Sequence, residues 1–310
     1  MTTAPLATRL DGLLFFPVTA FAPDGSPDLA AFRAHVRAGI DAGAGAVFAC
    51  CGTGEFHALA PEEFRDCVAA AVEEAAGRVP VVAGTGYGTA LAIHHARLAE
   101  EAGADGLLAL PPYLVVADQA GLLRHYTELA AATALDVIVY QRDNAVLTPD
   151  TAVALARTDG IIGLKDGLGD LGLMQRIVSA VRAEGLDLLY FNGLPTAELT
   201  AAAYRGIGVT LYSSAAFCFA PDIALAHHRA LAAGDDATTD LLVDVFFRPL
   251  VELRSLGRGY AVSLVKAAVR AGGQDVGEVR PPLSEPDPAH VGELLRLVDR
   301  ARALLKEAGA

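Results

Sequence analysis

The chain has 310 residues, of which 53% are hydrophobic and 20% charged, and it carries a formal net charge of −13. This length fits one large globular domain or two small ones, and α/β barrels often reach it as a single unit. An acidic surface repels phosphate backbones, so we expect no nucleic-acid partner. No uninterrupted apolar run reaches the roughly 18 residues of a membrane span, so we expect no membrane association.

Eight short apolar runs alternate with longer segments of helical spacing from one end of the chain to the other. Each run is nearly continuous in apolar residues, which is typical of strands covered on both faces in a parallel sheet. The predicted strands span residues 12–19, 46–51, 79–84, 106–110, 136–140, 160–165, 186–192 and 207–213. The clearest helical segments between them are residues 28–42, 61–76, 89–102 and 117–132.

Turn and cap residues agree with this order of elements. Prolines and carboxylates stand at the predicted helix starts 61–63 and 148–150, and glycines follow several helices. Eight strands in strict strand–helix order favour a closed (β/α)8 TIM barrel over a doubly wound sheet. We expect the barrel to span residues 1–234. Residues 235–310 are predicted to form additional C-terminal helices of the same domain, packed on the barrel or on a neighbouring subunit.

The cysteines and the start of the chain bear on its location. The chain has four cysteines, none in a C-x-x-C pair: Cys50, Cys51, Cys67 and Cys218. The first residues, MTTAPLATRLDG, lack the basic and apolar regions of a secretory signal. These observations predict a cytoplasmic protein with reduced thiols.

The sequence shows no pattern typical of a metal site. His94-His95 and His227-His228 lie in predicted helices, without carboxylate or cysteine partners at metal-ligand spacing. We therefore expect these histidines at the surface, and no metal.

Lysine is rare in this sequence. Only three of the 24 basic residues are lysines: Lys165, Lys266 and Lys306. A lysine can lose its proton when it is buried and become a nucleophilic amine, whereas a guanidinium cannot. Lys165 ends a predicted strand and is therefore a candidate for imine formation with a ketone; alternatively, it reaches from the strand end to solvent or forms an ion pair. Lys266 lies in an amphipathic helix, where a structural role is expected.

Barrel active sites lie at the C-terminal ends of the strands. Tyr140 ends the strand before Lys165, so the two should be neighbours, and a phenol there can relay protons or simply pack. The Gly52-Thr53-Gly54 turn can hold a carboxylate through its backbone N–H groups, or it is only a tight connection. This set of residues suits a reaction at the carbonyl group of a substrate that also carries a carboxylate.

These features together resemble one superfamily over almost the whole chain. The Gly-Thr-Gly-Glu turn at 52–55, Tyr140, the Gly-Leu-Lys-Asp strand at 163–166 and the C-terminal helices are similar to the dihydrodipicolinate synthase and N-acetylneuraminate lyase superfamily. The resemblance implies that Lys165 forms an imine, Tyr140 transfers protons, and Gly52 with Thr53 holds the keto-acid carboxylate. It implies no cofactor, because the imine is itself the electron sink.

Within the superfamily, residues 12–19, 163–170, 193–198 and 212–215 resemble the branch of 5-dehydro-4-deoxyglucarate dehydratases. That resemblance implies conversion of the keto-acid sugar 5-dehydro-4-deoxy-D-glucarate into 2,5-dioxopentanoate, water and carbon dioxide. A substrate with two carboxylates needs a second anion site. Arg142, with help from Ser213 or Ser214, is the predicted contact of the distal carboxylate, since arginine favours bidentate carboxylate binding.

Some positions depart from the other branches of the superfamily. The synthases usually carry two threonines where this chain has Gly52-Thr53, so their tyrosine–threonine–tyrosine proton relay is incomplete here. Tyr113 stands at the place of the second tyrosine, as a binding residue whose part in a relay is open. The lyases carry acidic residues after the glycine that matches the substrate-binding candidate Gly193, whereas this chain has Pro195 and Thr196. Sialic acid is therefore a poor candidate substrate.

Two other interpretations remain. A pyruvate-dependent aldolase or synthase would use the same carbonyl-handling residues, and a barrel that only binds keto acids would use them without turnover. The family resemblance also implies a homo-oligomer, specifically a tetramer built from dimers.

Overall fold

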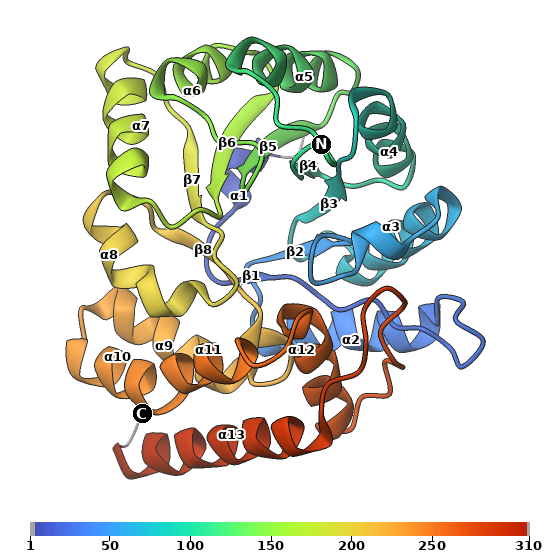
Figure 1. The fold of residues 1–310 in the computed structure, drawn as a ribbon, viewed down its shortest axis with the longest axis vertical. Coiled ribbons are helices and arrows are strands. Elements are labelled where there is room, and N and C mark those ends of the chain that lie inside the picture. The colour runs from blue at the N-terminus through green and yellow to red at the C-terminus, as the bar shows by residue number, and fades with distance from the viewer. Residues whose placement is uncertain (1–3, 309–310) are drawn as a thin grey trace.

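Eight parallel strands form a closed barrel in which each strand pairs with its neighbours in sequence and β1 pairs with β8. This computed structural model describes residues 4–308 (Figure 1); the outermost parts of the two predicted regions, residues 1–3 and 309–310, lie outside it. The strands are β1 (Leu14–Phe15), β2 (Ala46–Ala49), β3 (Val81–Thr85), β4 (Gly106–Ala109), β5 (Asp136–Gln141), β6 (Ile161–Asp166), β7 (Leu189–Asn192) and β8 (Leu211–Ser214). The predicted (β/α)8 barrel is confirmed.

A ring of helices surrounds the barrel, as Figure 1 shows. These helices are α2 (Leu29–Ala42), α3 (Pro61–Ala75), α4 (Thr89–Glu101), α5 (Gln119–Ala131), α6 (Pro149–Ala156), α7 (Leu171–Ala183), α8 (Ala201–Gly206) and α9 (Pro221–Ala233). Asp28, Asp118, Thr148 and Asp170 each cap a helix start by accepting a backbone N–H. None of the helices in residues 4–308 is long and apolar enough to cross a membrane.

The short helix α1 (Leu6–Arg9) covers the N-terminal mouth of the barrel. Leu6 and Leu10 belong to the apolar cluster that fills the barrel interior, together with Leu14, Phe48 and Ile138. The interior is thus packed with side chains from that end, as in other barrels of this type. Any site must therefore lie at the opposite end.

The C-terminal region consists of helices that pack beside α9 and α2, at the bottom of Figure 1. They are α10 (Asp236–Leu242), the π-helical turn η4 (Val243–Phe247), α11 (Arg248–Arg254), α12 (Tyr260–Ala271) and α13 (Pro288–Ala308). Phe246, Leu264 and Leu294 form an apolar cluster with Ile223 of α9. The predicted additional helices are therefore present and share a core with the barrel.

The surface position predicted for both histidine pairs is wrong for one member of each. His95 is 4% exposed and packs on Phe56 and Phe64, while His227 is fully buried against Phe247. Successive residues on a helix point about 100° apart, so a pair on an amphipathic helix has one member on the inner face. Burial lowers the pKa of His227 to about 4, so its ring is neutral at pH 7.

Candidate active site

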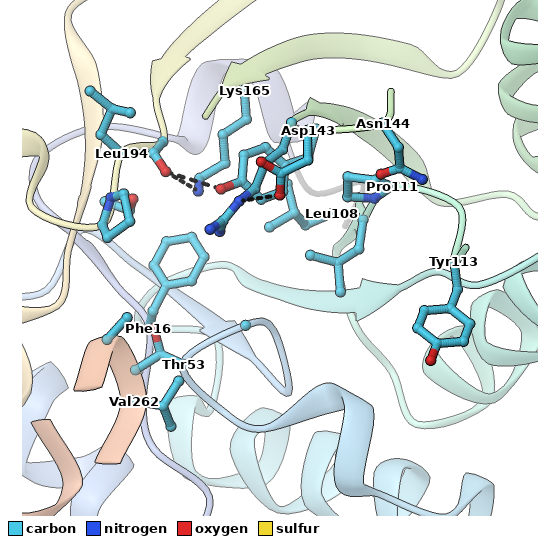
Figure 2. Close-up of a pocket in the computed structure, with 18 of the residues that line it drawn as sticks. Phe16, Thr53, Leu108, Pro111, Tyr113, Asp143, Asn144, Lys165, Leu194 and Val262 are labelled. Carbon is cyan, nitrogen blue, oxygen red and sulfur yellow. Dashed lines mark hydrogen bonds and ion pairs between the residues drawn. The ribbon is translucent and has the colours of Figure 1, made fainter. Parts of the chain in front are cut away.

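A cavity of about 690 Å³ opens at the C-terminal end of the barrel. Its walls come from the strand ends, from the loop that follows β4, and from Ala261 and Val262 of α12. Figure 2 shows Lys165 reaching from its strand into this cavity, with Phe16, Thr53 and Val262 below it. Most of the wall is apolar, and the cations that line it are Lys165 and Arg142.

Lys165 is only 5% exposed, although it carries an amine. Its Nζ lies 4.0 Å from the ring centre of Tyr140 and 5.0 Å from that of Phe16, and it donates to the carbonyl oxygen of Gly193 at 3.4 Å. Within residues 4–308, no carboxylate lies at ion-pair distance from this amine. A buried amine without an ion-pair partner is in position to attack a ketone bound in the cavity.

Asp166, the next residue, faces away from the cavity, because successive strand residues point to opposite sides. Its carboxylate accepts from Gln141 Nε2 at 2.8 Å and from the Tyr204 hydroxyl. Asp166 is therefore not the partner of Lys165. Its carboxylate is instead held by hydrogen bonds behind the barrel wall.

Tyr140 lies directly beside Lys165, since the two residues are paired in the register of β5 and β6. The Tyr140 hydroxyl donates to Gly193 O at 3.1 Å, so one carbonyl accepts from both the phenol and the amine. A ketone carbon bonded to Nζ would lie within reach of this phenol. The arrangement suits proton transfer at the carbon atoms next to an imine.

Two glycines leave space for these side chains. A Cβ on Gly193 would lie 2.7 Å from Lys165 Cγ and 2.8 Å from Nζ, and one on Gly167 would lie 2.7 Å from the Tyr140 hydroxyl. Such distances are too short for carbon, so a larger residue at either position would displace the lysine or the tyrosine. Gly193 thus borders the site and supplies its shared carbonyl.

Gly52 and Thr53 line the cavity in the loop after β2. In the part of the chain that the structure describes, their backbone N–H groups donate to no protein acceptor. Cys50 and Glu55, on either side, have φ angles of 51° and 55°, in the left-handed region that residues other than glycine rarely adopt. The loop therefore presents two free donors on a strained backbone, which fits an anion site.

The side chains predicted for a distal carboxylate are only partly brought together. Arg142 and Ser213 line the cavity, and Arg142 Nε lies 3.1 Å from Asp143 Oδ2. Partial burial lowers the pKa of Arg142, but Tyr140 and Asp143 outweigh this effect, so it remains a cation. Ser214 does not line the cavity, because its hydroxyl points to the other side of β8 and donates to Glu198.

Tyr113 lies at the rim, well apart from Lys165 in Figure 2. It is 66% exposed and belongs to a loop with three further exposed apolar residues, Leu114, Val115 and Val116. Asn144 holds this loop by donating to the carbonyl oxygens of Pro112 and Val115, each at 2.6 Å. In this single chain, Tyr113 does not contact the amine.

Sequence reasoning missed several residues around the cavity. Asn144, Ala261 and Val262 carry no local signal, because an amide in a loop and two small apolar residues on a distant helix are common everywhere. Glu198 lies in the 3-10 turn η2 (Ala197–Thr200) behind Ser214 and is 2% exposed. Only its place near the end of the barrel could have drawn attention to it.

Across residues 4–308, no group of three histidine, cysteine, aspartate or glutamate side chains is arranged to hold a metal ion.

The chain belongs to the dihydrodipicolinate synthetase family, whose model matches residues 9–301. It is 74% identical to a probable 5-dehydro-4-deoxyglucarate dehydratase of Streptomyces griseus, over 100% of this chain and 98% of that relative. A probable 5-dehydro-4-deoxyglucarate dehydratase 1 of Streptomyces avermitilis is 73% identical over 99% of both chains.

Solved structures agree with the family. Dihydrodipicolinate synthase from Bacillus clausii superposes with a TM-score of 0.88 at 26% identity, covering 96% of this chain and 100% of that one. The chloride-inhibited dihydrodipicolinate synthase from Acinetobacter baumannii, complexed with pyruvate, gives a TM-score of 0.84 at 25% identity, over 94% and 99% of the two chains. The barrel and its C-terminal helices are therefore a shared architecture.

The Gly193→Ala variant tests the space that the lysine needs. Its methyl group would push against Lys165 Cγ and Nζ and against the backbone oxygen of Asp166, so we expect the lysine and the end of β6 to shift and turnover to fall roughly 100-fold, the cost of misplacing a reacting group by about 1 Å. A Cβ at Gly206 meets no atom within 4 Å, so Gly206→Ala is the matched control and should retain activity. Equal activity of the two variants would contradict the close approach.

Glu198 gives a prediction for stability against pH. Burial raises the pKa of Glu198 from 4.5 to about 7, although the Ser214 hydrogen bond acts in the opposite direction. The folded state therefore favours the protonated form; the resulting stabilisation is complete below about pH 4.5 and is lost as the pH rises to about 7. Glu198→Gln stays neutral at every pH. From pH 5 to pH 8, we expect the variant to gain on the order of 2 kcal/mol in unfolding free energy relative to the unmodified protein.

Denaturant unfolding at both pH values measures this difference. The same change at the exposed Glu278 is the control and should leave the pH dependence of stability unaltered. A Glu198→Gln protein whose stability followed that of the unmodified chain at both pH values would show that this carboxyl is ionised when folded.

Proposed function

We propose that this protein is a hydro-lyase that dehydrates and decarboxylates 5-dehydro-4-deoxy-D-glucarate to 2,5-dioxopentanoate. The observation that carries the proposal is the buried Lys165 amine, without a carboxylate partner, at the base of a cavity in a chain whose full-length relatives are probable 5-dehydro-4-deoxyglucarate dehydratases. The substrate is inferred from the names of the relatives, and the imine chemistry that this substrate needs is inferred from the site.

The first half of the reaction is dehydration. Lys165 Nζ attacks the C5 ketone, and loss of water gives an iminium that acidifies the C4 protons. Removal of one C4 proton, with Tyr140 as the nearest phenol, gives an enamine. The enamine electrons expel the C3 hydroxyl, which leaves as water after protonation. The product of this half is an iminium conjugated with a C3–C4 double bond.

The second half is decarboxylation into the same electron sink. The C1–C2 bond breaks, carbon dioxide leaves, and the electron pair passes through C3 and C4 to the nitrogen. Protonation at C3 and C4 gives the aldehyde at C2 and restores the iminium at C5. Water then hydrolyses the iminium, which releases 2,5-dioxopentanoate and the free amine. The balance is one substrate to one aldehyde, one water and one carbon dioxide.

Each end of the substrate has a candidate binding group. The free N–H groups of Gly52 and Thr53 suit the keto-acid carboxylate next to the imine carbon. Arg142, with Ser213, suits the distal carboxylate, because both line the cavity and arginine binds carboxylates with two hydrogen bonds.

A pyruvate-dependent aldolase or synthase is the second candidate. The pyruvate complex of the Acinetobacter baumannii synthase, at 25% identity, favours it, because pyruvate presents the same keto-acid end to the same kind of site. The two candidates differ only in what the distal part of the cavity accepts. A barrel that binds keto acids without turnover would differ from both in producing nothing.

Turnover and trapping together test these candidates. We expect carbon dioxide and 2,5-dioxopentanoate from 5-dehydro-4-deoxy-D-glucarate, and a borohydride-reduced adduct on the peptide that contains Lys165. Lys165→Arg should lower turnover by at least roughly 1,000-fold and abolish the adduct. The matched control is Lys306→Arg at an exposed helical position, which should behave as the unmodified protein.

The pattern of results distinguishes the alternatives. Efficient pyruvate exchange without carbon dioxide release would favour the aldolase. An adduct without any turnover would favour a binding protein, and no adduct on Lys165 would remove the centre of both catalytic proposals.

We also propose that the protein is a cytoplasmic homo-oligomer, and specifically a tetramer. The exposed apolar residues 113–116 beside the cavity support self-association, since water-exposed apolar patches at a site mark interfaces. The four free and buried cysteines support a reducing compartment.

A single charge in the patch tests the assembly. Val116, which is 86% exposed, is the most exposed of the four, and Val116→Glu should shift the mass from light scattering toward that of smaller species. Leu256→Glu, at an apolar side chain of another loop that is 64% exposed, is the control. An unmodified chain that is monomeric at micromolar concentration would refute the proposal.

A further inference from the structure

Behind the Gly52–Thr53 loop lies an ion pair with no access to solvent. Lys266 Nζ of α12 donates to Glu55 Oε1 at 2.8 Å, and both side chains are 0% exposed. The second carboxylate oxygen, Oε2, accepts the backbone N–H of Arg280 at 2.9 Å. Nζ also lies 4.0 Å from the ring centre of Phe21. Each oxygen of the buried carboxylate therefore has its own donor.

This ion pair is costly to bury, so its place in the molecule requires a reason. Two charges removed from water each lose several kcal/mol of hydration, and well-packed apolar residues often stabilise a fold as well or better. The two residues are 211 positions apart in the sequence and join a barrel loop to a C-terminal helix. Stability alone is a weak explanation for such a pair.

Glu55 holds the outer end of the proposed carboxylate-binding loop. It directly follows Gly54, and its φ of 55° is one that glutamate adopts only under constraint. The carbonyl oxygen of Gly54 accepts a hydrogen bond from the Thr19 hydroxyl at 2.7 Å, which fixes the position of Gly54 next to Thr53. With Glu55 and Gly54 both held, the backbone of Gly52 and Thr53 is fixed at the cavity, and its N–H groups have no protein acceptor among the described residues.

The same helix also shapes the cavity wall. Ala261 and Val262, one turn before Lys266 on α12, line the cavity together with Thr53. Figure 2 shows Val262 and Thr53 on the same side of the cavity, below Phe16. The helix α12 of the C-terminal region thus both contacts Glu55 at the end of the Gly52–Thr53 loop, through Lys266, and forms the cavity wall next to that loop.

We propose that the Glu55–Lys266 pair positions the Gly52–Thr53 loop for the keto-acid carboxylate, so that a C-terminal helix outside the barrel controls substrate binding. This inference rests on the proposed function, since it assumes that the loop binds that carboxylate. Glu55 and Lys266 are positioning residues: neither lines the cavity, and both act through the backbone of the loop.

The experiment separates carboxylate binding from imine formation. The double variant Glu55→Gln/Lys266→Met removes both charges, so neither charge is left buried without its partner. Two probes are reduced onto Lys165 with borohydride over a range of concentrations: pyruvate, which has the carboxylate, and hydroxyacetone, which has the same ketone with an uncharged hydroxymethyl group in place of the carboxylate. The measured quantity is the probe concentration that gives half-maximal adduct.

We expect this concentration to rise about tenfold or more for pyruvate, the loss expected when two hydrogen bonds to a charged group are misaligned. For hydroxyacetone it should stay within about twofold, and the maximal adduct should be unchanged with both probes. For the dehydration itself, KM should rise more than kcat falls. Equal changes for both probes, or none for pyruvate, would overturn the positioning role.

A second ion pair on the same helix is the matched control. Arg270, four residues after Lys266, pairs with Glu285 at a partly buried position. Arg270→Met should lower the melting temperature without changing the pyruvate concentration for half-maximal adduct. If Arg270→Met weakened pyruvate binding as strongly as the double variant, the effect would belong to α12 in general and the proposal would fall.

The remaining outcomes are also decisive. Should the double variant fail to fold, the single Glu55→Gln variant carries the same test: glutamine keeps one acceptor oxygen, so the separate bonds that the two carboxylate oxygens accept from Lys266 and from the Arg280 N–H are no longer both made. If neither variant folded, the pair would be a requirement of folding and not a positioning device. The proposed function fails separately: in that case the unmodified protein itself would release no carbon dioxide from 5-dehydro-4-deoxy-D-glucarate.

Discussion

The site depends on a lysine amine that is removed from water without a negative partner. Several features of the barrel end serve this single constraint. Asp166, the nearest carboxylate in sequence, is turned away by the alternation of the strand and is bonded to Gln141 and Tyr204. Gly193 leaves the space in which the lysine lies and offers it only a neutral carbonyl. The thiol of Cys51 is nearby but is not a counterion, because burial raises its pKa to about 12, more than Lys165 lowers it.

The charges that the barrel end does contain are kept in separate places. Glu55 and Lys266 neutralise each other behind the Gly52–Thr53 loop, and burial lowers the pKa of Lys266 against the opposing effect of Glu55. Glu198 is held behind β8, with a carboxyl that favours its neutral form. The ionisable side chains of opposite sign that line the cavity are those of Lys165 and Arg142 and the carboxylate of Asp143, so basic residues outnumber acidic ones there, on a chain whose net charge is −13. An acidic protein can in this way bind a doubly negative substrate.

The sequence was sufficient to predict the fold and the centre of the site, for a physical reason. Continuous apolar runs in strict alternation with helices have few compact solutions other than a parallel barrel, and in that fold the ends of adjacent strands must meet. Tyr140 and Lys165 could therefore be placed side by side from their positions alone. The family resemblance then supplied roles for Lys165, Tyr140, Gly52 and Thr53, and the second carboxylate of the substrate suggested those of Arg142 and Ser213. All of these roles remain predictions.

Features that depend on orientation or on distant contacts were beyond the sequence. Ser213 and Ser214 are adjacent at a strand end, and only the phase of the strand decides which one faces the cavity. The Glu55–Lys266 pair joins two segments of quite ordinary local pattern, so its partners could not be matched before the helices were placed. In the same way, the sequence did not reveal that one histidine of each pair, His95 and His227, faces the core.

The packing of α1 against the barrel has a consequence for the traffic of molecules. Leu6 and Leu10 seal the N-terminal mouth and the interior is filled, so nothing can leave the cavity through the barrel axis. Substrate, water, carbon dioxide and aldehyde must therefore enter and leave at the C-terminal end of the barrel. Because 2,5-dioxopentanoate keeps the keto-acid end of the substrate, it would return to the same amine and compete with new substrate. Accumulated product would then slow the enzyme as a competitive inhibitor, in proportion to its own affinity for the amine.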